Sequence, residues 1–141
     1  MKKKIIFIVG PTSVGKTKLS VDIAKDFSGE IISCDSMQIY KEFNIGTAKI
    51  TEEVNGINHY MIDILDGNQK FNVSEYKNMA EKYIEEIYSH NNIPIFVGGT
   101  GLYVNSILYD FKFTESEESN NLREQITEFY EKNGAILLYD L

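Results

Sequence analysis

The sequence predicts an α/β protein with a doubly wound parallel sheet, and three observations support this fold class. Short apolar strands alternate with amphipathic helical segments, in the order strand, helix, strand and later helix, strand, helix. The runs Ile5–Val9 and Ile93–Val97 are continuously apolar, as in strands that are buried on both faces of a parallel sheet. A glycine-rich loop follows the first of these strands, where open parallel sheets usually bind ligands.

The remaining elements are predicted from apolar spacing and capping signals. The helix after the glycine-rich loop has Leu19, Ile23 and Phe27 four residues apart, with Ser20 and Ala24 beside them, which places these residues on one helical face. A later helix has Asn72 and Glu75 in a capping-box arrangement at its start. The other expected elements are strands at Glu30–Cys34 and His59–Leu65, a helix opened by Gly98–Gly101, and an amphipathic helix with Leu122, Ile126 and Phe129 that ends at Gly134.

Composition sets limits on the class of protein. The chain has 141 residues, and its 43% hydrophobic and 25% charged residues are the balance of an ordinary globular protein. One cysteine and two histidines rule out an intrachain disulfide and a Cys/His zinc cage. No apolar run is long enough to span a membrane or to form a signal-peptide core, so we expect a cytoplasmic protein without a membrane partner.

Charge is distributed unevenly along the chain. The formal net charge is −7, which by itself argues against a nucleic-acid binder. Residues 1–50 nevertheless carry 8 Lys against 5 acidic residues, whereas residues 114–141 carry 2 basic against 7 acidic residues. A site for a polyanion is therefore expected in the first third of the chain.

The glycine-rich loop predicts a phosphate site. Its sequence matches the pattern G-x-x-x-x-G-K-[ST] completely, between a strand and a helix, which gives the fold a P-loop NTPase-like character. Backbone N–H groups and the helix N-terminus would hold phosphate oxygens, Lys16 would add a positive charge, and the Thr17 hydroxyl could bind Mg²⁺. The expected diphosphate- or nucleotide-binding residues are Gly10, Pro11, Thr12, Ser13, Val14, Gly15, Lys16 and Thr17.

Two further polar residues follow strand ends. The strand Ile93–Val97 ends without the acidic residue that a standard P-loop ATPase uses for Mg²⁺, and the strand-end acid is instead Asp35. A carboxylate at that place suits a general base for an attacking group, although Asp35 could also cap the turn before Met37. Thr100 supplies a hydroxyl near the same edge and could also cap the following helix.

Together these motifs resemble those of one known family. The blocks that carry the resemblance are GPTSVGKT at 10–17, GEIISCDS at 29–36, QIY at 38–40, NIGTAK at 44–49, His59 with Ile62-Asp63, and GGTGLY at 98–103. In this order and spacing they resemble the N-terminal part of the tRNA dimethylallyltransferase (tRNA isopentenyltransferase) family. Asn58 and Tyr60 depart from the pattern, because the family usually has Pro and a second His beside the position of His59.

The resemblance implies an activity and a set of roles. It implies transfer of a dimethylallyl group from dimethylallyl diphosphate to N6 of adenosine 37 in the anticodon stem-loop of tRNA, with Mg²⁺ as cofactor. Asp35 would be the general base, and Lys16 and Thr17 would act on the diphosphate, with Thr17 at the metal. The implied tRNA contacts are Asp35, Ser36, Met37, Gln38, Thr100 and Arg123, of which Arg123 could equally be a solvated helix residue.

The resemblance also implies an incomplete chain. Members of the family are about twice this length, so residues 1–113 are expected to form the P-loop core and residues 114–141 the start of a helical tRNA-binding insertion. We expect a monomer. Two other functions stay open: a P-loop kinase for a small molecule or nucleoside that uses ATP, and a nucleotide-binding module or fragment that holds diphosphate without turnover. The kinase would need Arg residues over the γ-phosphate, and the chain has a single Arg.

Overall fold

The computed structural model describes residues 3–41, 56–113, 122 and 124–133 of the chain. The chain divides into two compact units, Met1–Phe111 and Lys112–Leu141. The block NIGTAK at residues 44–49 lies outside the described residues, and so does Arg123. The first unit contains the sheet, its helices and the phosphate loop.

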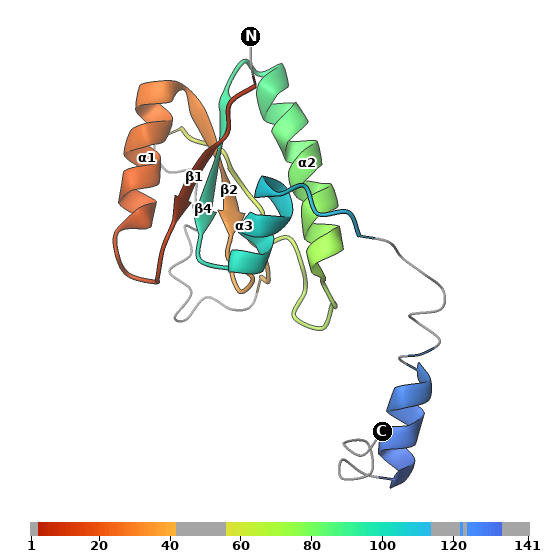
Figure 1. The fold of residues 1–141 in the computed structure, drawn as a ribbon. Helices are drawn as coiled ribbons and strands as arrows, with labels where there is room; N and C mark the ends of the chain where they lie inside the picture. Colours follow the sequence, from red (N-terminus) through yellow and green to blue (C-terminus); the bar gives the residue numbers. More distant parts are fainter. Residues whose placement is uncertain (1–2, 42–55, 114–121, 123, 134–141) are drawn as a thin grey trace. The chain divides into compact units, whose positions relative to one another are not determined.

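The first unit is built on a parallel sheet of four strands. Its strands are β1 (Ile6–Val9), β2 (Gly29–Cys34), β3 (His59–Tyr60) and β4 (Ile93–Gly98), in the spatial order β1-β4-β2-β3. Every pairing is parallel, and the register pairs Val9 with Gly98 and Gly98 with Cys34. The carboxyl ends of β1, β4 and β2 are therefore level with one another, which brings the loops that follow them to one edge of the sheet (Figure 1).

Helices cover the two faces of this sheet. Helix α1 (Lys16–Phe27) lies on one face, and α2 (Val73–Ser89) and α3 (Gly101–Leu108) lie on the other (Figure 1). The sheet side chains alternate accordingly: Ile31 and Ile95 pack into a core with α1, and Ile32 and Phe96 pack into a core with α2. The doubly wound α/β architecture is thus confirmed.

The start of α2 follows the local sequence signal closely. The Asn72 side chain accepts a hydrogen bond from the backbone N–H of Glu75, and the Glu75 side chain accepts one from the backbone N–H of Asn72. This reciprocal pair satisfies donors that the first helical turn leaves without partners. The expected capping box is confirmed.

Two expectations need correction. The buried residues of α1 are Ser20, Val21 and Ala24, whereas Leu19 and Phe27 are 51% and 57% exposed. Ser20 and Ala24, which were expected beside the apolar face, thus form its centre, and the buried face is rotated away from Leu19 and Phe27 because small side chains let the helix approach the sheet closely. The third strand is also shorter than His59–Leu65: it ends at Tyr60, since Met61 and Asp63 adopt positive φ angles that break an extended strand.

The amino end of the sheet holds a buried carboxylate. Glu30 in β2 is only 3% exposed, and donors from two other segments surround it. Oε2 accepts hydrogen bonds from Tyr60 Oη at 2.6 Å and Asn58 Nδ2 at 2.9 Å, and Oε1 lies 2.8 Å from both His90 Nδ1 and Asn92 Nδ2. Burial alone would raise the pKa of Glu30, but these hydrogen bonds lower it from 4.5 to about 2. The charged Glu30 thus joins β2 to β3 and to the segment after α2.

The second unit contributes helical structure at residues 122 and 124–133. Leu122, Ile126 and Tyr130 are exposed within the part of the chain that the structure describes. The helix expected around Ile126 and Phe129 is confirmed as a helix. None of the described helices combines the length and the apolar character that a membrane crossing would require.

Candidate phosphate and acceptor site

The loop between β1 and α1 has the geometry of an anion-binding loop. Gly15 precedes the first residue of α1 with a φ of 90°, a left-handed conformation that favours glycine, and no side chain caps this helix end. Ser13 also has a positive φ, of 66°. Backbone N–H groups of the first helical turn are therefore left for an anion, and the positive end of the helix dipole favours one there.

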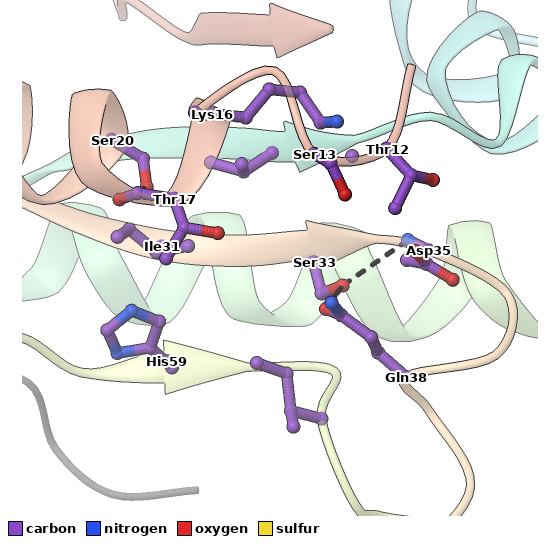
Figure 2. A pocket seen from close by; sticks show the side chains of 14 residues that line it. Thr12, Ser13, Lys16, Thr17, Ser20, Ile31, Ser33, Asp35, Gln38 and His59 are labelled. Atoms are coloured by element: carbon purple, nitrogen blue, oxygen red, sulfur yellow. Dashed lines mark hydrogen bonds between the residues drawn. The ribbon is translucent and has the colours of Figure 1, made fainter. Parts of the chain in front are cut away.

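Lys16 lies over this loop. Its Nζ donates a hydrogen bond to the carbonyl oxygen of Pro11, at 2.5 Å, so the ammonium group crosses the loop from the helix to its opposite side. Thr17 follows in the first turn of α1 and is exposed. The two side chains that the motif assigns to phosphate and metal thus emerge from the same end of the helix (Figure 2).

The strand ends beside the loop approach each other closely. A Cβ atom on Gly98 would lie 2.5 Å from the backbone carbonyl of Cys34, so only glycine allows β4 to end this near to β2. Gly10 N donates to Gly98 O at 3.3 Å, and Thr100 N donates to Cys34 O at 3.0 Å. The phosphate loop, the β4–α3 turn and the end of β2 are thereby held together.

The acidic residue at the end of β2 is fixed by local hydrogen bonds. Asp35 Oδ1 accepts a bond from the backbone N–H of Met37 at 2.9 Å, so the capping interaction that the sequence left open is present. Thr100 Oγ1 accepts a bond from the backbone N–H of Ser36 at 3.0 Å and makes no capping bond to α3. Thr100 thus occupies the N-cap position of α3, as the sequence allowed, but its hydroxyl holds the turn that carries Asp35 and makes no capping bond to the helix.

A pocket of about 310 Å³ brings these groups together (Figure 2). It is lined by residues of the phosphate loop and by residues of β2, β3 and β4, among them Asp35. Its lining consists of Thr12, Ser13, Gly15, Lys16, Thr17, Ser20, Ile31, Ser33, Asp35, Gln38, His59, Ile62, Val97 and Gly98. Lys16 and Asp35 thus face one cavity, which is the arrangement that the interpretation of Asp35 as a base required.

Asp35 also belongs to a second pocket. That pocket has a volume of about 450 Å³ and contains Gly10, Pro11, Gly99 and Thr100. Asp35 and Thr12 are the residues that line both pockets. A molecule in one pocket and a molecule in the other would therefore meet at Asp35.

The other expected contact residues are spread around this site. Gln38 lines the first pocket, and its Oε1 accepts a hydrogen bond from Ser33 Oγ at 2.9 Å. Ser36 lies in the turn that Thr100 holds, and Met37 is 46% exposed. Val14 is exposed at the tip of the phosphate loop and lines neither pocket.

Sequence reasoning assigned no role to several residues of the pocket. Ser33 and His59 lie on the sheet face toward α1, since side chains alternate along a strand and Ile31 pairs with His59. Ser33 Oγ lies 3.3 Å from the backbone N of Asp35, from which it accepts a hydrogen bond. Counting alternate residues back from Asp35 along β2 would have placed Ser33 on this face, whereas His59 needs the strand pairing.

The pocket offers few protein ligands for a metal ion. Within the described ranges, no three His, Cys, Asp or Glu side chains gather as a metal cage. Thr17 and Asp35 contribute oxygen atoms to the pocket. Mg²⁺ usually keeps several waters and takes few protein ligands alongside phosphate oxygens, so these residues fit a hydrated Mg²⁺ that binds together with a phosphate group.

The fold and the loop define a P-loop α/β protein: a phosphate loop joins the first strand to a helix on a parallel sheet that is covered on both faces. The family can also be assigned. The sequence model of the IPP transferase family matches residues 38–141, and the chain belongs to this family.

Full-length relatives agree with this assignment. The tRNA dimethylallyltransferase of Thermoanaerobacter sp. (strain X514) is 52% identical over 141 residues, which are 99% of this chain and 45% of the relative. That of Lachnoclostridium phytofermentans is 48% identical over 97% of this chain and 44% of the relative. The chain thus spans less than half the length of these relatives.

Solved structures show the same fold. The full-length tRNA isopentenylpyrophosphate transferase of Bacillus halodurans superposes with a TM-score of 0.77 at 43% identity, covering 99% of this chain and 46% of that one. A eukaryotic dimethylallyltransferase acting on tRNA superposes with a TM-score of 0.75 at 36% identity, over 81% of this chain and 29% of that one.

Proposed function

We propose that this chain provides the diphosphate-binding and base-activating half of an enzyme that transfers a dimethylallyl group from its diphosphate to N6 of adenosine 37 in tRNA. The observation that carries the proposal is the single cavity that Lys16, Thr17 and Asp35 line in a member of the IPP transferase family. The anticodon stem-loop as substrate, Mg²⁺ as cofactor, a cytoplasmic location and a monomeric state are parts of the same proposal.

Each side of the cavity has a chemical task in this proposal. The loop N–H groups and Lys16 bind the diphosphate and stabilise the negative charge that grows as the allylic C–O bond breaks and its electron pair leaves with the diphosphate. Thr17 would hold Mg²⁺, which supplies further neutralisation of that charge when bound. Asp35 orients the exocyclic amine and takes its proton as the new N–C bond forms.

The target base must leave its stack to reach Asp35. A nucleotide inside a stacked anticodon loop cannot enter a closed cavity, and extruding it costs a few kcal/mol. The second pocket, which borders Asp35 and Thr100, gives that base a place beside the diphosphate pocket. The proposed tRNA contacts Asp35, Ser36, Met37, Gln38 and Thr100 all belong to the segments around these pockets, and Arg123 stays a prediction.

A test measures which group is transferred. The chain is incubated with an anticodon stem-loop RNA and either dimethylallyl diphosphate labelled in its prenyl group or ATP labelled in its γ-phosphate, beside the full-length Bacillus halodurans relative as a positive control. Prenyl label in the RNA supports the proposal, and transfer of the γ-phosphate would support a kinase instead. If the chain binds diphosphate but transfers no prenyl group, it supplies diphosphate binding alone and not the transfer reaction.

A matched pair of variants tests the base. Asp35→Asn keeps an oxygen that can accept the bond from Met37 N–H but removes the basic carboxylate, so we expect a loss of about 10²–10⁴-fold in the chemical step. Asp66→Asn makes the same change in an exposed carboxylate that pairs with Lys41, and should leave the rate unchanged. Equal rates in the two variants would exclude Asp35 as the base.

A further inference from the structure

His59 lines the first pocket, and only one of its two ring nitrogens, Nδ1, has a hydrogen-bond partner among the described residues. Its Nδ1 lies 2.9 Å from the carbonyl oxygen of Ile57, so Nδ1 carries the proton and donates it. Nε2 is then an acceptor. That atom is buried and has no partner among the residues that the structure describes. A buried acceptor without a donor costs stability, so such an atom in a pocket points to a donor that arrives with a ligand.

The strand register shows which part of the pocket His59 faces. His59 pairs with Ile31, and Asp35 lies four residues further along β2, a distance of roughly 13 Å along an extended strand. Figure 2 shows the ring near Ile31, with Ser33 and then Asp35 further along β2. The donor for Nε2 therefore lies deeper in the pocket than Asp35, where Thr17 and Ser20 of α1 also line it, and is not the amine that Asp35 would activate.

Among the residues that the structure describes, neighbouring side chains do not supply that donor. Ser20 lines the same region, but its hydroxyl donates to the backbone carbonyl of Thr17 at 2.8 Å. Ile31 and Val97, which also line it, are apolar. A cavity of about 310 Å³ has room for ordered water beside a diphosphate, so a water molecule can provide the missing O–H group.

We propose that His59 is a positioning residue whose Nε2 accepts a hydrogen bond from a water in the hydration shell of the divalent cation that binds with the diphosphate near Thr17. The inference rests on the proposed function, because it needs diphosphate and a cation in this pocket. A cation polarises its bound water, so the water O–H becomes a strong hydrogen-bond donor. The unprotonated Nε2 of a neutral imidazole can accept that hydrogen bond. Burial lowers the pKa of His59 and so favours the neutral ring.

Binding of inorganic diphosphate to the chain tests this role, with Mg²⁺ and separately with a chelator. His59→Asn can keep the donation to Ile57 but has no atom at the position of Nε2, whereas His59→Gln can place an amide oxygen there. We expect Asn to weaken Mg²⁺-dependent binding about five- to tenfold and Gln to restore most of it, with metal-free binding unchanged. His90→Gln, at the Glu30 end of the sheet, is the control and should bind like the unmodified chain.

Nitrogen NMR of the unmodified chain gives an independent measurement that does not depend on how a variant folds. The chain has two histidines, so the His59 signals are assigned by comparison with His90→Gln. We expect a proton on Nδ1 throughout, and an Nε2 resonance that moves toward that of a hydrogen-bonded acceptor on adding Mg²⁺ with diphosphate. With diphosphate and chelator it should stay in place.

The outcomes separate the two proposals. If the unmodified chain binds no diphosphate, the proposed function and this inference both fail. The role of His59 is overturned, and the proposed function stands, if the chain binds diphosphate with Mg²⁺ while the Nε2 resonance does not move. The same holds if His59→Asn weakens diphosphate binding as much without Mg²⁺ as with it. A proton on Nε2 would likewise overturn this role, because the ring would then donate.

Discussion

Replacing Glu30 by Gln should destabilise the fold in a pH-dependent way. The Glu30 carboxylate is buried and accepts hydrogen bonds from four side chains, which lower its pKa from 4.5 to about 2. Each pKa unit corresponds to about 1.4 kcal/mol, so the charged form contributes about 3 kcal/mol to the free energy of unfolding at neutral pH. Glu30→Gln removes the charge and turns an amide NH₂ toward side chains that are themselves donors. We therefore expect the free energy of unfolding to fall by about 3 kcal/mol.

The pH dependence has a definite direction. Because the pKa of Glu30 is lower in the folded protein than in the unfolded chain, its contribution is complete above pH 4.5 and is lost as the pH falls toward 2. The difference in unfolding free energy between Glu30→Gln and the unmodified chain should therefore be constant from pH 7 to 5 and shrink below pH 4.5.

Urea unfolding measures this difference. The chain has no Trp, so circular dichroism is the suitable signal. Glu85→Gln is the matched control, because Glu85 forms an exposed ion pair with Lys3 and should change stability by less than about 1 kcal/mol. A Glu30→Gln variant as stable as this control at pH 7, or a difference that persists unchanged at pH 3, would refute the reasoning.

Three further predictions concern the strand ends. Gly98→Ala should lower the free energy of unfolding by about 1–3 kcal/mol and weaken diphosphate binding, because the new Cβ would meet the Cys34 backbone. Gly101→Ala is the control for the same unfolding and binding assays and should be tolerated, since its Cβ would meet nothing within 4 Å. Thr100→Val should speed hydrogen exchange at the Ser36 amide by removing its acceptor, and Thr100→Ser should not. Burial raises the pKa of the Cys34 thiol to about 12, so a thiol reagent at pH 8 should label it only as fast as the chain unfolds, and rapidly in urea; fast labelling of the native chain would contradict this burial.

Short patterns of neighbouring residues were sufficient to predict much of the fold and, within the site, the phosphate loop and Asp35. The phosphate loop, the capping box of α2 and the strand Ile93–Val97, seen as β4 Ile93–Gly98, follow from short patterns whose physics is local. The position of Asp35 at a strand end also followed from the chain, because parallel strands bring their carboxyl ends to one edge. These features depend on backbone geometry within one or two turns of structure.

Long-range packing decided the rest. Which face of α1 is buried depends on how near the helix can approach β2 and β4, so the bulkier residues Leu19 and Phe27 stay exposed. Glu30 acquires its donors, and His59 its place beside Ile31, only when segments about 30 or more residues apart pair in the sheet. Apolar periodicity describes a segment by itself, whereas the partner of a buried polar atom is set by the three-dimensional contacts that satisfy it.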